Sequence, residues 1–289
     1  MISDITLGQF FPGTSFIHRL DPRSKILLSV FFIVAIFMAS NTVAFVAMAV
    51  FTLHLVLISG ISFKIILKSL KPIVFILIFT TLISVFMTTG DGDPLVAFWI
   101  IKIYKDGIIR AVFMSVRVIM LIIGTSVLLT YTTSPISLTD GIESLLSPLK
   151  KIKVPVHTFA MMITIALRFI PTLIEETEKI MNAQKSRGAD FSSGSLVKRA
   201  RALIPILVPL FVSSLKRADE LATAMECRCY RGDKNRTKLV KLTYRPADAV
   251  ALVWGVLVLG AVITLKIIPP YIAEGFNSLV YDIMFYTIR

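Results

Sequence analysis

Two arginines of this sequence stand in matching surroundings, 41 positions apart. Arg187 comes directly after Ser186, Arg228 comes directly after Cys227, and an alanine precedes each arginine by four positions. A guanidinium is planar and permanently charged, and its N–H groups donate hydrogen bonds to carboxylates and carbonyl groups. A small residue before it lets another protein surface approach the backbone closely. The repeated ending therefore predicts two docking points for partner proteins.

Both arginines come at the end of a long stretch that begins apolar and ends charged. We expect one helix over about Val156–Ser186 and a second over Leu196–Cys227, each about 45 Å long. Gly188 is suited to ending the first helix, because glycine adopts the left-handed backbone conformation without strain. Arginines near helix C-termini also favour the helix dipole. Each arginine taken alone therefore also has a purely structural explanation.

The composition places these helices in a membrane protein. Of the 289 residues 55% are hydrophobic and 17% charged, whereas soluble domains carry about 25% charged residues. Apolar runs of about 17–25 residues are typical of membrane-spanning helices. We expect an all-α polytopic membrane protein with about five transmembrane helices, at residues 26–40, 42–59, 72–87, 108–130 and 247–268.

The distribution of positive charge predicts the orientation and the division into domains. Lysines and arginines precede the first span and separate the second from the third, which predicts a cytoplasmic N-terminus. Residues 134–245 carry 19 Lys and Arg against 10 Asp and Glu. We therefore predict an N-terminal membrane part at 1–133 with four spans, and a cytoplasmic coupling module at 134–245. This module has about three helices, two of them long and amphipathic, lying in or under the inner leaflet. Residues 246–289 form the fifth span and a tail.

Several chemistries are disfavoured by what the sequence lacks. No Gly-Lys pair occurs anywhere, so the phosphate-binding loop of P-loop ATPases is missing. The spans hold almost no carboxylates, which ion-coupled carriers place there. The positive charge is dispersed among amphipathic helices, so nucleic-acid binding is a poor explanation. The only two cysteines, Cys227 and Cys229, lie without a cluster of further ligands, and we predict no metal site and no cofactor.

Five short motifs of this sequence are informative in combination. They are Gly8-Gln-Phe-Phe-Pro-Gly-Thr14, His18-Arg-Leu-Asp-Pro-Arg-Ser-Lys25, Ala166-Leu-Arg-Phe-Ile-Pro171, Asn182-Ala-Gln-Lys-Ser-Arg-Gly-Ala-Asp-Phe191 and Ala224-Met-Glu-Cys-Arg-Cys-Tyr-Arg-Gly232. Together these motifs resemble the transmembrane T component (EcfT) of energy-coupling factor (ECF) ABC transporters. The resemblance covers about residues 5 to 267, and the combination of motifs is specific even though each is short.

The resemblance implies a function and partners. It implies a non-catalytic, multi-pass subunit in a prokaryotic plasma membrane, belonging to an ATP-driven uptake transporter for a vitamin or transition metal. Its partners would be two ABC-type ATPase subunits, which bind the ATP, and a substrate-binding S component. Arg187 and Arg228 would each dock on one ATPase, with Ser186, Gly188, Cys227 and Cys229 as their neighbours in the two motifs.

The second motif departs from the family pattern at Cys229, where glycine is usual. If that position needs a positive φ, cysteine costs about 1 kcal/mol or more. Two explanations stay open: the site is an ordinary helical turn in this chain, or the ATPase groove has adjusted.

Three further residues are candidates for structural roles near the coupling helices. Asp21 is suited to cap a helix that starts at Pro22, but Asp21 or Arg23 could instead brace a coupling helix by an ion pair. Arg168 is a second candidate for bracing the coupling module.

The alternative function for the whole chain is a membrane-embedded enzyme acting on lipid-linked phosphate substrates, with its basic face holding the phosphates.

Overall fold

A computed structural model of the chain describes residues 10–88, 96–98, 101–191, 195–232 and 242–267. The chain forms two compact units. The described residues from 10 to 134 and from 242 to 267 form one unit, the helical bundle. The described residues from 135 to 232 form the other, the α5–α7 unit. The tail predicted after the fifth span lies outside the described residues.

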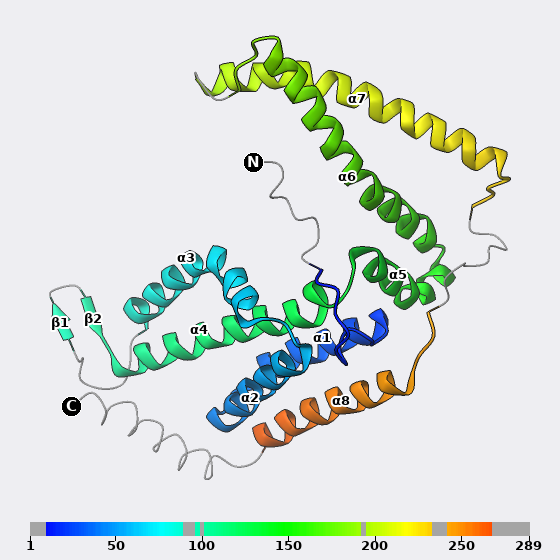
Figure 1. Ribbon diagram of the computed structural model, residues 1–289. Helices are drawn as coiled ribbons and strands as arrows, with labels where there is room; N and C mark the ends of the chain where they lie inside the picture. The colour runs from blue at the N-terminus through cyan, green and yellow to red at the C-terminus, as the bar shows by residue number, and fades with distance from the viewer. Residues whose placement is uncertain (1–9, 89–95, 99–100, 192–194, 233–241, 268–289) are drawn as a thin grey trace. The chain divides into compact units, whose positions relative to one another are not determined.

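The described part of the helical bundle has five α-helices, each of which overlaps one apolar run of the sequence (Figure 1). The fourth continues without a break into a π-helical segment, Ser126–Tyr131. α3 begins nine residues before the predicted span, so its first turns carry three lysines. The helices are α1 (Pro22–Met38), α2 (Thr42–Ser59), α3 (Phe63–Met87), α4 (Lys105–Thr125) and α8 (Pro246–Ile267).

A short antiparallel hairpin joins α3 to α4. β1 (Val96–Phe98) pairs with β2 (Ile101–Ile103), with Val96 opposite Ile103 and Phe98 opposite Ile101. Each strand has three residues. The prediction of an all-α polytopic membrane protein is confirmed, and the hairpin is a local addition to it.

The core of the bundle lies around α1, which packs against α2, α4 and α8. Its buried residues include Phe32 and Ile36, and these meet Met48 of α2 and Val127 of the π-helical segment. Gly124 permits this packing, because a Cβ at that position would lie 2.1 Å from the ring of Phe32. The small residue is therefore required by the close approach of two helices.

Five helical segments among the described residues are long and apolar enough to cross a membrane. Four of them correspond to predicted spans: Thr42–Ser59, Phe63–Met87, Gly107–Tyr131 and Pro246–Ile267. The fifth is Val156–Ser186, for which we predict an interfacial position instead. Helix α1, which contains the predicted span 26–40, has 17 residues and lies at the lower limit for spanning a bilayer.

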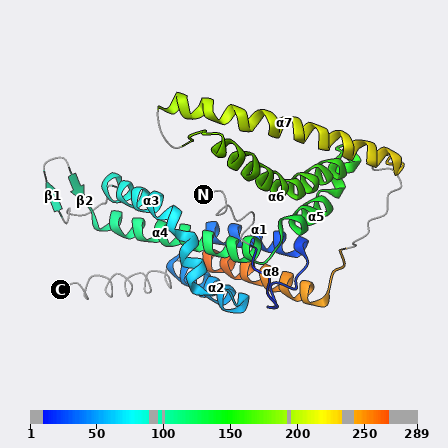
Figure 2. The ribbon, with the colours of Figure 1, turned by 45° about the horizontal axis from the view of Figure 1, so that its top comes forward.

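The α5–α7 unit contains the two long helices. α5 (Pro135–Leu145) is followed by a 3₁₀ segment (Ser147–Ile152), then by α6 (Val156–Ser186) and α7 (Leu196–Cys227). The bounds of α6 and α7 agree with the predicted ones, and Ser195 caps α7 by accepting a bond from the Lys198 N–H. α6 and α7 pack against each other and run in roughly opposite directions (Figures 1 and 2).

Candidate functional site

The C-terminal end of α6 holds the first predicted docking motif. Arg187 is the C-cap residue, with φ −87°, and Gly188 follows with φ +87°. The Gly188 N–H bonds the Lys185 carbonyl at 2.9 Å, and the Ala189 N–H bonds the Gln184 carbonyl at 3.0 Å. This pair of bonds satisfies carbonyls that the helix would otherwise leave open. Gly188 therefore ends the helix as predicted.

The C-terminal end of α7 repeats this geometry. Arg228 is the C-cap residue with φ −90°, and Cys229 follows with φ +56°. The Cys229 N–H bonds the Glu226 carbonyl at 2.8 Å, and the Tyr230 N–H bonds the Met225 carbonyl at 3.0 Å. Cys229 thus adopts the left-handed conformation, and the interpretation of an ordinary helical turn at this position is wrong.

Both arginines are available for a partner. The side chains of Arg187 and Arg228 are exposed, and neither makes a hydrogen bond or ion pair within the part of the chain that the structure describes. Ser186 uses its hydroxyl to bond the Asn182 carbonyl of its own helix, at 3.1 Å. Cys227 and Cys229 are free and exposed. Each helix end therefore presents one unpaired guanidinium beside small side chains.

A polar contact that the sequence analysis missed joins the two helices. The Glu176 carboxylate accepts a bond from the Ser213 hydroxyl at 2.6 Å and one from the Arg217 guanidinium at 2.7 Å. Glu176 and Arg217 are 41 positions apart, the same separation as between Arg187 and Arg228. From this shared separation the ion pair between Glu176 and Arg217 could have been predicted.

The third predicted bracing residue, Arg168, does not join this contact. It is exposed on α6 and makes no hydrogen bond or ion pair with the described residues. An apolar groove of about 270 Å³ lies between α6 and α7 instead, lined by residues such as Ile165, Phe169 and Leu221. The bracing role of Arg168 stays a prediction.

Asp21 is the N-cap of α1, as the capping interpretation predicts. Its carboxylate accepts a bond from the Arg23 N–H at 2.9 Å. Its own N–H donates to the Asp248 carboxylate at 2.7 Å, which the sequence analysis did not anticipate. Asp248 is 1% exposed and also accepts a bond from the Arg245 N–H at 2.7 Å. One buried carboxylate therefore ties together the first turns of α1 and α8.

Two basic side chains on the first turn of α1 bind backbone carbonyls in other parts of the bundle. Arg23 lies over the ring of Tyr244, 5.2 Å from its centroid, and donates to the Leu242 carbonyl at 3.3 Å. Lys25 is 2% exposed and donates to the Thr132 carbonyl at 2.7 Å. The ammonium thus satisfies a carbonyl at the end of the π-helical segment, where a positive charge is favoured. Whether Asp21 or Arg23 also braces a coupling helix stays a prediction.

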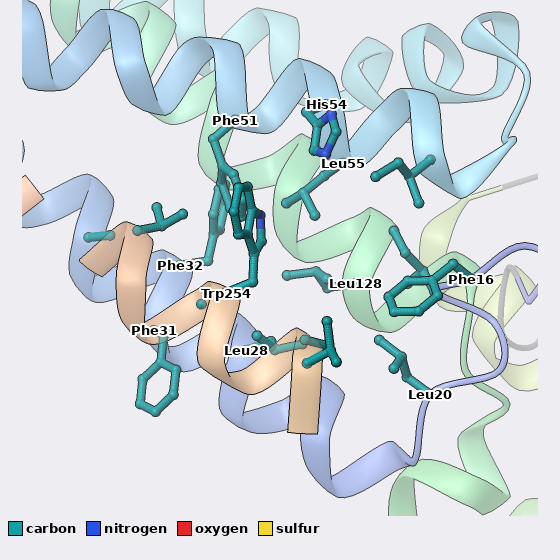
Figure 3. Close-up of a pocket in the computed structure, with 17 residues that line it drawn as sticks. Phe16, Leu20, Leu28, Phe31, Phe32, Phe51, His54, Leu55, Leu128 and Trp254 are labelled. Atoms are coloured by element: carbon teal, nitrogen blue, oxygen red, sulfur yellow. The ribbon is translucent and has the colours of Figure 1, made fainter. Parts of the chain in front are cut away.

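An apolar pocket of about 220 Å³ lies among the N-terminal segment, α1, α2 and α8 (Figure 3). Its labelled walls include Phe16 and Leu20 before α1, Phe51 on α2 and Trp254 on α8. His54 is the one ionisable residue among the lining residues, and it makes no hydrogen bond with the described residues. Such a lining has no pair of groups that could act as acid and base.

Among the described residues no group of three or more His, Cys, Asp or Glu is placed to hold a metal ion. The described residues form two exposed arginines on matching helix ends, an ion pair between their helices, and a bundle of apolar helices. These features define a multi-pass helical membrane protein with two matching, arginine-bearing helix ends.

Comparison with known proteins specifies the family. Residues 13–239 match the family CbiQ, described as cobalt transport protein. The chain is 54% identical to the energy-coupling factor transporter transmembrane protein EcfT of Clostridium kluyveri, over 87% of this chain and 93% of the relative. It is 50% identical to EcfT of Thermosediminibacter oceani over 90% and 98% of the two chains. The EcfT of Bacillus subtilis is 46% identical, over 88% and 95%.

The chain belongs to the EcfT family of energy-coupling transmembrane proteins. The resemblance seen in the motifs is therefore confirmed over most of the chain. The alternative of an enzyme for lipid-linked phosphates finds no support among these relatives.

Proposed function

We propose that this chain couples ATP hydrolysis on two ABC-type ATPase subunits to substrate uptake by a separate S component that binds a vitamin or transition metal. The observation that carries the proposal is the matching geometry of the two helix ends, each with an exposed and unpaired arginine. Membership of the EcfT family supports it, since the relatives are named as transmembrane proteins of energy-coupling factor transporters.

Each arginine docks in a groove on one ATPase. A guanidinium needs carboxylate or carbonyl oxygens as partners, and neither Arg187 nor Arg228 has any within the described residues. The left-handed residue that follows each arginine turns the chain away from the helix axis, so that the arginine stands at the tip. ATP is bound and hydrolysed by the partner subunits, and this chain is not itself catalytic.

The S component lies against the apolar surface of the same two helices. α7 exposes a stripe of large apolar side chains at helical spacing, including Leu203, Leu207 and Phe211. α6 exposes Phe159 and Met162 in its first turns. An exposed apolar surface of this extent marks a contact with protein or membrane. A rigid-body shift of the docking ends would move this surface without changing the helices themselves.

The proposed setting is a prokaryotic plasma membrane with the N-terminus and both docking ends in the cytoplasm. The positive charge of residues 134–245 supports this orientation, because loops rich in Lys and Arg stay on the cytoplasmic side.

Co-purification tests the docking function. The tagged full chain is expressed with the two candidate ATPases of the same genome, as wild type, Arg187→Ala, Arg228→Ala and the double variant. We expect the ATPases to be retained by wild type, reduced by each single substitution and lost from the double variant. Arg199→Ala is the matched control, because Arg199 is also exposed but stands on the first turn of α7.

Two outcomes would contradict the proposal. If the ATPases never associate with wild type, the chain does not couple them. If wild type and double variant retain the ATPases equally, the complex exists but the arginines only cap their helices.

A further inference from the structure

A second basic site lies in the helical bundle. A pocket of about 430 Å³ opens where α1 ends, α2 begins and α3 ends, against the first half of α4. Among the described residues its lining combines two arginines with hydroxyl, amide and thioether side chains and holds no carboxylate. These polar and apolar side chains include Asn41, Ser84, Thr88, Arg110, Met114 and Arg117.

The two arginines lie on the same face of α4. Arg110 and Arg117 are seven residues apart, which is two helical turns and about 10 Å along the axis. Within the membrane-spanning segment Gly107–Tyr131, Arg110 is the fourth residue and Arg117 the eleventh. Arg110 is therefore at the level of the interface, and Arg117 is within the apolar layer.

Arg117 is only partly satisfied by the protein. Its Nη2 donates to the Ala39 carbonyl at the end of α1, at 2.8 Å, and its guanidinium lies 5.9 Å from the ring of Phe45. Its Nε is buried and has no hydrogen-bond partner in the described chain. A charged group at membrane depth is costly unless an opposite charge or further acceptors accompany it. A carbonyl and an aromatic face do not neutralise the charge.

The described surroundings of the pocket add positive potential. α2 begins at the pocket, and its N-cap residue Asn41 does not cap it, because the Asn41 amide donates to the Leu265 carbonyl at 2.9 Å. The N-terminal end of a helix carries partial positive charge. Arg110 is exposed and makes no hydrogen bond or ion pair with the described residues. The pocket is thus built for an anion.

The apolar part of the lining indicates which anion. Met114 stands on α4 between the two arginines and is 53% exposed, and Phe113 lies beside it. An anion with an apolar tail would use both parts of this surface, whereas a free inorganic anion would leave the apolar part uncovered. Phosphate oxygens bind guanidinium groups in a bidentate manner, and basic pockets between transmembrane helices suit lipid headgroups.

We propose that this pocket binds an anionic phospholipid, with its phosphate between Arg110 and Arg117 and its acyl chains along Met114 and Phe113. The hydroxyl groups of Ser84 and Thr88 line the same pocket and supply further donors to the headgroup. The lipid would neutralise the buried guanidinium and hold together the ends of α1, α3 and α4. The proposal is independent of the docking function and of the orientation in the membrane.

Lipid retention by the purified full chain tests this site. Native mass spectrometry counts phosphatidylglycerol and phosphatidylcholine bound after equilibration with an equal mixture of the two. We expect wild type to retain phosphatidylglycerol preferentially. Arg110→Gln should weaken this binding about fivefold, the factor expected for one cation near a lipid surface. Arg110→Lys, which keeps the charge, should restore most of it.

Arg110 is the residue to change because Arg117 also holds the Ala39 carbonyl, so that its loss could unfold the bundle. Lys64→Gln is the matched control, since Lys64 is exposed near the start of α3, outside the pocket. Equal retention of phosphatidylglycerol by wild type and Arg110→Gln would overturn the proposal. So would displacement of the lipid by inorganic phosphate at the concentration where phosphatidylglycerol itself competes, because the site would then take free phosphate.

Discussion

Glu176 of α6 and Arg217 of α7 form an ion pair of 2.7 Å, and each lies eleven residues before the arginine that ends its helix. Eleven residues of helix measure about 16 Å. The two helices therefore extend by equal lengths from one polar contact to the proposed docking residues Arg187 and Arg228. Because the two lengths are equal, a displacement of either helix end would be transmitted over the same length of helix to the contact between Glu176 and Arg217.

Glu176→Gln should loosen this crossing. The Gln side chain keeps the Ser213 hydrogen bond but loses the charge that pairs with Arg217, whose side chain is 36% exposed. We expect a coupling energy of about 1 kcal/mol between Glu176→Gln and Arg217→Gln, since partly exposed pairs contribute modestly. Thermal unfolding of the two single variants and the double variant measures it.

The control for this cycle is Glu175→Gln, because Glu175 is exposed and makes no ion pair with the described residues. A coupling energy of zero between Glu176 and Arg217 would mean that apolar packing alone holds α6 against α7.

Substitutions at the two left-handed residues should act in opposite directions. Gly188→Ala should destabilise the end of α6 by about 1 kcal/mol, because alanine resists φ +87°. The space around Gly188 is open, so the cost comes from the backbone alone. Cys229→Gly should stabilise the end of α7 by up to about 1 kcal/mol, since glycine relieves the strain at φ +56°.

Hydrogen exchange at the backbone amides of Ala189 and Tyr230 measures both effects, because these amides close the two helix ends. We expect faster exchange at Ala189 in Gly188→Ala and slower exchange at Tyr230 in Cys229→Gly. The same direction of change in both variants would contradict the assigned geometry.

Asp248→Asn should destabilise the helical bundle by about 2 kcal/mol. The carboxylate is buried and accepts two backbone bonds, from Asp21 and Arg245. An amide keeps one acceptor and turns a donor toward the other N–H, so one buried N–H loses its partner. Thermal unfolding in detergent measures the loss. Asp219→Asn, at an exposed position on α7, should leave the midpoint unchanged.

The two cysteines can report on which side of the membrane the C-terminal end of α7 lies. Cys227 and Cys229 are the only cysteines of the chain, and both are exposed. A maleimide that cannot cross membranes should label them in inside-out vesicles and not in intact cells. Labelling in intact cells would contradict the proposed cytoplasmic position of Arg228.

Much of this architecture follows from local sequence. The apolar runs determine where four of the spans lie, because a bilayer requires long apolar helices. The limits of α6 and α7 follow from local signals as well: Ser195 caps the start of α7, and Gly188 ends α6. Asp21 before Pro22 specifies the start of α1 for the same reason.

Tertiary structure decided the features that depend on residues far apart in the chain. The bond from Asp21 to Asp248 spans 227 positions, and no periodicity indicates it. The left-handed φ of Cys229 contradicts the preference of its residue type, and only the helix end imposes it. The pocket around Arg117 arises from the ends of three helices. Sequence therefore determined the helices and their ends, whereas packing between helices decided which charges are paired and which are left for a partner.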